Sequence, residues 1–200
     1  MEVGKNMVNV ILSSNLFVKE GSTNVTLKKI EAFLQELNLK KEEAIVSVIT
    51  NAEPKYGITT VEGLARNNFQ RVFEMVLSEH NIEEQCGIIE KSDIVILTGG
   101  NPYPLLEALK VTGVLNHLID DCVLVGVSAG AMVLGKDIEL ASESCENKYG
   151  IPSDAFNYFG DHIIVPHYAE EGYFSKESIQ HLNNEKILTI DEDDQTAFII

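Results

Sequence analysis

The fold is decided by residues 123–134, which read VLVGVSAGAMVL. Three apolar residues open this stretch and predict a short buried strand, and a Gly-x-Ser-x-Gly turn at 126–130 leads into small and apolar residues that predict a helix. This order matches the nucleophile elbow, in which a serine lies at the sharp bend between a strand and a helix. Ser128 is therefore a candidate nucleophile, and the alternative is a serine that only caps the helix.

Apolar segments of strand length alternate with helical patterns on both sides of this elbow. Uninterrupted apolar strands separated by helices are typical of a parallel sheet that is covered on both faces. No repeat, low-complexity run or linker divides the chain, so we predict one α/β domain over residues 1–200. Strands are expected at 7–12, 44–49, 94–97, 123–125, 163–165, 187–190 and 197–200, and helices at 24–37, 61–80, 102–109 and 176–182.

Three polar motifs follow expected strands, namely residues 98–101 (TGGN), 126–130 (GVSAG) and 166–168 (PHY). In open parallel sheets, ligands bind outside the carboxyl ends of the strands. Because these ends share one edge of the sheet, we expect the three motifs to meet there and to form a site.

The composition argues against several classes of partner. The net charge is −16, and the hydrophobic content of 44% is sufficient for a real core. Lys and Arg form no basic stripe, so neither a nucleic acid nor an anionic membrane surface is expected as a partner. No segment approaches the about 20 apolar residues of a membrane span.

The cysteines indicate a reducing compartment. Cys86, Cys122 and Cys145 form neither a CxxC pair nor a zinc-ligand spacing, so we expect reduced thiols and no metal or organic cofactor. The N-terminal residues lack the apolar core of a signal peptide, and a cytoplasmic location is expected. The last expected strand runs to Ile200, so we expect a short tail to follow it.

A serine nucleophile needs a general base, because its hydroxyl is almost never ionised at neutral pH. His167 comes directly after an expected strand and a proline that restrains the chain, so we expect it at the same sheet edge as Ser128. His162 precedes that strand and is a second candidate, as a partner or as a supporting group. The other three histidines lie in helical, polar stretches and are expected at the surface.

The base must be oriented by a third group, usually a carboxylate. Glu143 lies between Ser128 and His167 in the chain and is the preferred candidate, with Asp137 and Glu139 as nearby alternatives. The acidic run at 191–194 (DEDD) is expected to be a solvated turn.

Acyl transfer also needs hydrogen-bond donors for the oxyanion. The backbone N–H of Ala129, which follows the serine, is one candidate. Gly99 and Gly100 at the neighbouring strand end are candidates for the other, because glycine lets the backbone approach a substrate closely. The alternative is a plain turn that leads into the helix at Pro102.

Together, the GGN, SAGA and PH motifs, in this order and spacing, resemble the dipeptidase E (aspartyl dipeptidase) family of serine peptidases, to which cyanophycinase is related. The resemblance covers residues 7–200. It implies an α/β three-layer sandwich with a mostly parallel central sheet, the class I glutamine amidotransferase-like fold of flavodoxin-like topology. It further implies that Ser128 is the nucleophile, His167 the base, and Gly100 and Ala129 the oxyanion-hole donors.

The resemblance also bears on the acid and on substrate recognition. The family's acid lies about fifteen residues after the serine, which falls on Glu143, although many members carry aspartate there. Asn101, Lys176 and Tyr168 are the expected substrate contacts, and for Tyr168 the alternative is packing in the fold. Aspartyl-specific members use an arginine after the histidine, whereas Lys176 is the nearest cation here and lacks the bidentate fork of arginine. We therefore expect no strict preference for an N-terminal aspartate.

The leading hypothesis is a cytoplasmic serine peptidase, a monomer or homodimer, that hydrolyses short peptides through an acyl-enzyme on Ser128. One alternative keeps the site and changes the substrate to a small ester or amide. Another is a non-catalytic relative that acts as a binding module. An amidotransferase would need a thiol at the elbow, and Cys122 lies six residues upstream of Ser128.

Overall fold

The computed structural model describes residues 8–14, 25–50, 65–169, 174–177, 179–182, 185–191 and 195–199. Its centre is a six-stranded sheet, and a separate two-stranded sheet follows in the chain. The central strands are β1 (Asn9–Ser13), β2 (Ile45–Thr50), β3 (Arg71–Val76), β4 (Ile94–Leu97), β5 (Val123–Val127) and β8 (Gln195–Ile199). The second sheet consists of β6 (His162–Tyr168) and β7 (Lys186–Asp191), and the helices are α1 (Val25–Glu36), α3 (Ile82–Ile89), α4 (Pro102–Thr112) and α5 (Ala129–Met132).

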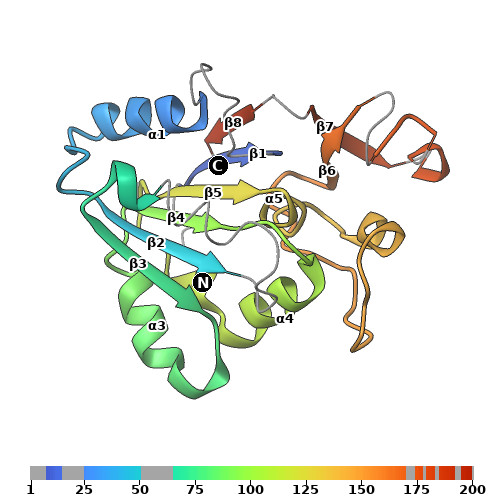
Figure 1. Cartoon of the computed structure of the whole chain (residues 1–200), viewed down its shortest axis with the longest axis horizontal. Coiled ribbons are helices and arrows are strands. Elements are labelled where there is room, and N and C mark those ends of the chain that lie inside the picture. Colours follow the sequence, from blue (N-terminus) through green and yellow to red (C-terminus); the bar gives the residue numbers. More distant parts are fainter. Residues whose placement is uncertain are drawn as a thin grey trace, which may run out of the picture.

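The central sheet has the strand order β3-β2-β4-β5-β1-β8. Its first five strands run parallel, and β8 pairs antiparallel with β1. Helix α1 covers one face, and α3 and α4 cover the other (Figure 1). This arrangement confirms the predicted α/β fold with a mostly parallel central sheet between helical layers.

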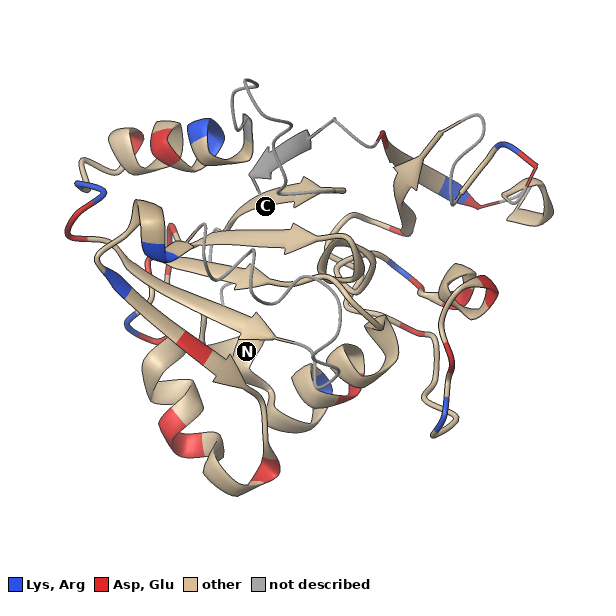
Figure 2. Cartoon of the chain, viewed as in Figure 1, with Lys and Arg blue, Asp and Glu red and all other residues tan. Residues whose placement is uncertain are grey.

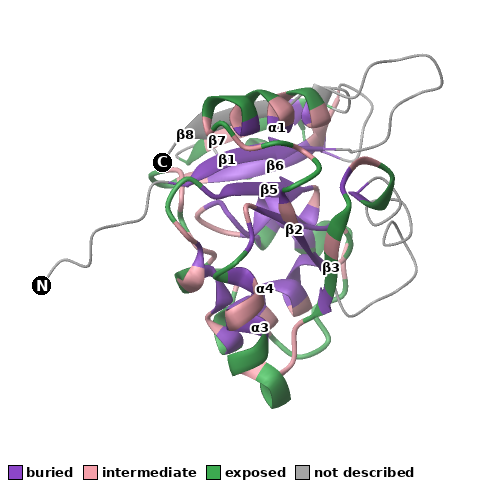
Figure 3. Ribbon diagram, turned by 90° about the vertical axis from the view of Figure 1, so that its left-hand side faces the viewer, coloured by how far each residue is buried: buried purple, intermediate pink, exposed green. Residues whose placement is uncertain are grey.

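Hydrophobic side chains fill the space on both faces of the sheet. On one face, Ile11 of β1 packs in a cluster with Ile30 and Leu34 of α1. On the other, a larger cluster includes Leu97 of β4 and Leu106 of α4. All residues of β4 and β5 are buried, and β5 is purple in Figure 3. Burial on both faces explains why the two strands read as apolar runs.

The charged side chains lie around this core. In the part of the chain that the structure describes, Lys and Arg are scattered among acidic residues and do not form a stripe (Figure 2). No helix within the described ranges combines the length and apolar character needed to cross a membrane.

The predicted helix at 61–80 is wrong over most of its described length. Residues 61–64 lie outside the described part of the chain, only 65–68 are α-helical, and residues 79–80 belong to the 3₁₀ turn Glu79–Asn81. Residues Arg71–Val76 instead form β3, which pairs in parallel with β2. Phe73 is 43% exposed and Val76 is 62% exposed, so these apolar side chains belong to an open edge strand and not to the buried face of a helix. Pairing with β2 outweighs the local helical spacing in this segment.

The segment after β5 departs from the expectation in two further respects. The helix predicted at 176–182 is reduced to a single 3₁₀ turn, Gln180–Leu182, with residue 178 outside the described ranges. The strand predicted at 163–165 extends to Tyr168, so His167 lies within β6 and not beyond a strand of the central sheet. The β6–β7 pair lies beyond the carboxyl ends of β1 and β5 in Figure 1, where β6 can reach the elbow.

At the elbow, the helix and the sheet approach each other closely. A Cβ atom at Gly130 would lie 2.2 Å from the carbonyl oxygen of Leu97, and one at Gly126 would lie 2.7 Å from the carbonyl oxygen of Gly130. Both neighbours are backbone atoms, so they cannot move aside as a flexible side chain could. Glycine at these two positions therefore allows α5 to start directly above β4 and β5.

This contact gives a stability prediction. Gly130→Ala is expected to lower the free energy of unfolding by about 3 kcal/mol, because the added methyl group must displace packed backbone. The matched control is Gly87→Ala in α3, where a Cβ would meet nothing within 4 Å. That control should raise the free energy of unfolding by about 0.5–1 kcal/mol, since alanine is the better helix former. Urea denaturation measures both, and equal midpoints for wild type and Gly130→Ala would contradict the packing argument.

Candidate active site

Ser128 lies at the end of β5 in a backbone conformation that side chains rarely adopt. Its φ is 51° and its ψ is −110°. Such strain persists only where surrounding bonds determine it. The Ser128 N–H donates to the carbonyl oxygen of Ser13 (2.8 Å), and the Ser128 carbonyl accepts from the amides of Ala131 (2.9 Å) and Met132 (3.0 Å). Sequence and structure thus agree on a strained strand-to-helix elbow with a half-buried serine at its tip.

His167 approaches this serine from the second sheet. Its Nε2 lies 2.9 Å from the Oγ of Ser128, a hydrogen-bond distance. The histidine has a φ of 55° at an irregularity in β6, where the register with β7 shifts between Val165 and Tyr168. The bulge therefore turns the imidazole toward the elbow. The predicted meeting of these two side chains is present, although it joins two sheets and not two strand ends of one sheet.

The turn after β4 passes close to the serine. A Cβ at Gly99 would lie 3.3 Å from the Cβ of Ser128, and the next residue, Gly100, has a φ of 128°. Within the described residues, neither the N–H of Gly100 nor that of Ala129 donates a hydrogen bond. Both N–H groups thus lack an acceptor among the described residues, as donors reserved for an oxyanion would.

The structure does not bring Glu143 to the histidine. Glu143 ends the 3₁₀ turn Glu139–Glu143 and is exposed, and its carboxylate makes no hydrogen bond in the described part of the chain. The buried residues of this turn, Leu140 and Ala141, orient it so that its end faces solvent. The prediction of Glu143 as the orienting carboxylate therefore has no contact to support it.

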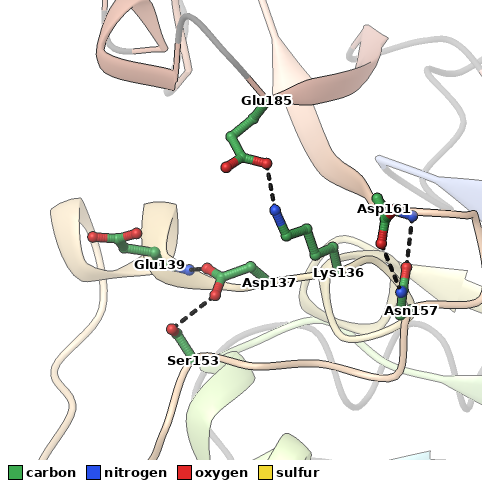
Figure 4. A network of polar contacts seen from close by, with 7 residues as sticks. All are labelled: Lys136, Asp137, Glu139, Ser153, Asn157, Asp161 and Glu185. Atoms are coloured by element: carbon green, nitrogen blue, oxygen red, sulfur yellow. Dashed lines mark hydrogen bonds and ion pairs between the residues drawn. The ribbon is translucent and has the colours of Figure 1, made fainter.

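The alternative acids, Asp137 and Glu139, lie in the network of Figure 4. Asp137 accepts hydrogen bonds from the Glu139 N–H and from the Ser153 hydroxyl, so it caps the turn that contains Glu139. Lys136 pairs with Glu185, and this pair ties the segment after α5 to the start of β7. The hydrogen bond to Glu185 raises the pKa of Lys136 above its ordinary value. This network supports the segment after α5, and within the described residues no hydrogen bond joins Asp137 or Glu139 to His167.

The acidic run predicted at 191–194 is described only at its first residue. Asp191 is exposed at the end of β7, and its partner in the register is Tyr168, which directly follows His167. Residues 192–194 lie outside the described part of the chain. The end of β7 therefore lies beside the histidine.

The predicted substrate contacts have varied surroundings. Asn101 caps α4 by accepting from the Tyr103 N–H (3.1 Å), and its amide donates to the carbonyl oxygen of Glu146 (2.9 Å). Tyr168 is half-buried and packs against the larger hydrophobic cluster. Lys176 is exposed and makes no ion pair within the described residues. Of these three residues, Lys176 is therefore the one whose side chain contributes least to holding the fold together.

The other candidate groups are distant from the elbow or chemically unsuited. His162 lies at the start of β6, where its Nδ1 is bonded to the carbonyl oxygen of Phe159, so it serves the turn before the strand. Cys122 precedes β5, at the opposite end of the strand from Ser128, and burial raises the pKa of its thiol to about 12. A thiol of this kind stays protonated at neutral pH, which removes the basis for an amidotransferase. Within the described ranges, no group of three or more His, Cys, Asp or Glu side chains could hold a metal ion.

Ser14 is the residue at this site that the sequence analysis missed. Its hydroxyl oxygen accepts a hydrogen bond from the backbone N–H of His167 at 2.8 Å. The only signal in the sequence is a pair of serines that follows the first apolar strand.

Comparison with known protein families identifies the family of this chain. The sequence model of Peptidase family S51 matches residues 10–198, nearly the whole chain. The chain belongs to peptidase family S51. The family resemblance inferred from the GGN, SAGA and PH motifs is thereby confirmed, and the chain is assigned to the serine-type peptidases.

Relatives of this family S51 chain carry the name Peptidase E. It is 35% identical to Peptidase E of Pasteurella multocida (strain Pm70) over 98 residues, which cover 46% of this chain and 41% of the relative. It is 27% identical to Peptidase E of Actinobacillus pleuropneumoniae serotype 5b (strain L20) over 167 residues, which cover 81% of this chain and 69% of the relative. The first alignment thus spans less than half the length of the relative it matches.

Solved structures show the same fold. A candidate peptidase E protein from Listeria monocytogenes EGD-e superposes with a TM-score of 0.71 at 20% identity, covering 97% of this chain and 98% of that one. A peptidase from an acI-B1 Actinobacterium gives a TM-score of 0.68 at 15% identity, covering 96% and 84%. These structures confirm the class I glutamine amidotransferase-like fold predicted from the sequence.

Proposed function

We propose that this family S51 member hydrolyses short peptides through an acyl-enzyme on Ser128. The observation that carries the proposal is the 2.9 Å distance between the Nε2 of His167 and the Oγ of Ser128 at the strained elbow. A histidine at this distance can take the hydroxyl proton while the oxygen attacks. Family membership supports the reaction class, and the geometry supports the residues.

The proposed reaction proceeds in two halves. Ser128 Oγ attacks the scissile carbonyl carbon as its proton passes to His167 Nε2, and the N–H groups of Gly100 and Ala129 donate to the developing oxyanion. The tetrahedral intermediate then breaks at the C–N bond, and His167 returns the proton to the leaving amine. Water, deprotonated by the same histidine, releases the acyl group and restores the free serine.

The proposed substrates are short peptides without a strict requirement for aspartate. Lys176 is the cation nearest to the place where aspartyl-specific members carry arginine, and it is exposed and without an ion pair in the described part of the chain. A lysine there offers a point charge and no bidentate fork. The free thiols of Cys86, Cys122 and Cys145 support a reducing, cytoplasmic location.

A substrate panel tests this proposal. Wild-type protein and Ser128→Ala are incubated with dipeptides that carry aspartate, alanine or leucine at the N-terminus, with a blocked tripeptide and with short-chain esters. We expect Ser128-dependent cleavage of several dipeptides, with no more than about a tenfold preference for aspartate. Cleavage of the esters alone would assign an esterase. If Ser128 is needed for the cleavage of none of these compounds, the remaining hypothesis is a non-catalytic binding module.

The exposed position of Glu143 gives a prediction about the orienting acid. Glu143→Gln is expected to lower kcat by no more than about 3-fold, because the carboxylate makes no hydrogen bond to any of the described residues. Removal of the true orienting carboxylate should cost up to about 10⁴-fold. Steady-state kinetics of single amide variants at Glu143, Asp137, Glu139 and the four acidic residues 191–194 compare the candidates. The run at 191–194 is included because β7 ends beside His167. A hundredfold loss in Glu143→Gln would overturn the expectation.

A further inference from the structure

Ser14 joins three segments that are far apart in the sequence. It follows β1 directly and is 1% exposed. Its Oγ accepts a hydrogen bond from the His167 N–H at 2.8 Å and donates one to the carbonyl oxygen of Ile190 in β7 at 2.8 Å. One hydroxyl therefore holds both strands of the second sheet against the end of the central sheet.

The Ser14 hydroxyl accepts a hydrogen bond from the His167 N–H at a position where β6 does not pair regularly with β7. The β6–β7 register is regular from His162 to Val165 and resumes at Tyr168, so His167 falls in the irregular step. Its φ of 55° is a conformation that costs free energy for a residue other than glycine. The Ser14 hydroxyl gives the backbone N–H an acceptor in that conformation. The imidazole direction depends on this φ, and so does its distance from Ser128.

The backbone of Ser128, the proposed nucleophile, is held by Ser13, the residue before Ser14. The carbonyl oxygen of Ser13 accepts the N–H of Ser128 at 2.8 Å. Consecutive residues at the end of β1 thus hold the backbone of the serine and the backbone of the histidine. Any shift of the second sheet relative to this strand end would change the Nε2–Oγ distance.

We infer that Ser14 is a positioning residue that fixes His167 within reach of Ser128. The inference rests on the proposed function above. Ser14 acts through the backbone of the histidine and does not touch the reacting atoms. Without the Ser14 hydroxyl, both reacting side chains are still present, but their alignment changes. A displacement of about 1 Å between reacting groups can cost about 10²-fold in rate.

The first test is Ser14→Ala. We expect kcat for the best dipeptide to fall by about 10- to 100-fold while KM changes by less than about 3-fold. The matched control is Ser47→Ala on β2. It removes another buried hydroxyl, whose Oγ lies 2.7 Å from the Oγ of Ser92. That control should keep kcat within about 2-fold. Wild-type kcat in folded Ser14→Ala would overturn the inference.

A double-mutant cycle separates positioning from a general loss of structure. In a His167→Ala background, Ser14→Ala should cause no further loss of residual activity, because the group that it positions is absent. Multiplying losses would show that Ser14 does not act through His167. Ser14→Cys serves if the alanine variant does not fold, since the thiol fills the space but is a weaker hydrogen-bond partner. It should lower kcat by about 3- to 10-fold, and wild-type kcat in that variant would count against the inference.

A measurement that needs no turnover keeps the two proposals apart. The ¹⁵N resonance of His167 Nε2 should shift in Ser14→Ala toward its value in Ser128→Ala, because both variants lose the Nε2–Oγ hydrogen bond. An unchanged resonance would refute the role of Ser14 even if the protein cleaved no substrate. A shifted resonance in a protein without Ser128-dependent cleavage would sink the proposed function and retain the positioning role.

Discussion

Replacing Ser128 by alanine is expected to lower kcat for dipeptide hydrolysis by about 10⁴- to 10⁶-fold. The variant loses the only atom that is proposed to bond to the substrate. The expected residual rate would come from substrate binding and from the two proposed oxyanion-hole donors. The backbone bonds of residue 128 to Ser13, Ala131 and Met132 do not involve the hydroxyl, so the fold should be preserved.

The measurement is single-turnover cleavage at saturating substrate, with circular dichroism to verify folding. Ser142→Ala is the matched control, since Ser142 is an exposed serine of the 3₁₀ turn Glu139–Glu143. The control should retain full activity. A loss of less than about tenfold in Ser128→Ala would show that another group carries out the attack.

Replacing His167 by alanine is expected to cost about 10⁴-fold or more in kcat. Among the described residues, no other base is then within hydrogen-bond distance of the serine hydroxyl to take its proton. The matched variant is His162→Gln, which changes the other histidine of the same strand, five residues away from His167 and bonded to the turn that contains Phe159. It should keep kcat within about 5-fold, although it should unfold more easily.

Steady-state assays of the two variants side by side decide between the two histidines. Equal losses would indicate that the effect reflects the stability of β6. A larger loss in His162→Gln would reverse the assignment of the base.

The elbow and the central strands could be predicted because their causes are local. Close packing of α5 on the sheet requires glycine at 126 and 130. Burial of β4 and β5 requires the apolar runs at 94–97 and 123–125. Strand β3 could not be predicted in this way. Only Met75 of this strand is buried, so its sequence pattern reflects an open edge, and its pairing with β2 is visible only in three dimensions.

The site was predictable in its chemistry and less so in its geometry. A strand-end serine and a later histidine are visible as motifs, and their side chains lie 2.9 Å apart. The bulge that aims His167 and the hydroxyl of Ser14, 153 positions earlier in the chain, leave no local pattern. The same limit applies to Glu143, which was chosen by spacing along the chain and is turned toward solvent by the packing of Leu140 and Ala141.

The most direct test of the central claim, that His167 activates Ser128, is mass spectrometry of the intact and digested protein after reaction with a fluorophosphonate. We predict one adduct, located on the peptide that contains Ser128, absent from Ser128→Ala and formed at least about 10²-fold more slowly in His167→Ala. A folded wild-type protein that takes up no reagent, or an adduct that persists in Ser128→Ala, would contradict the claim.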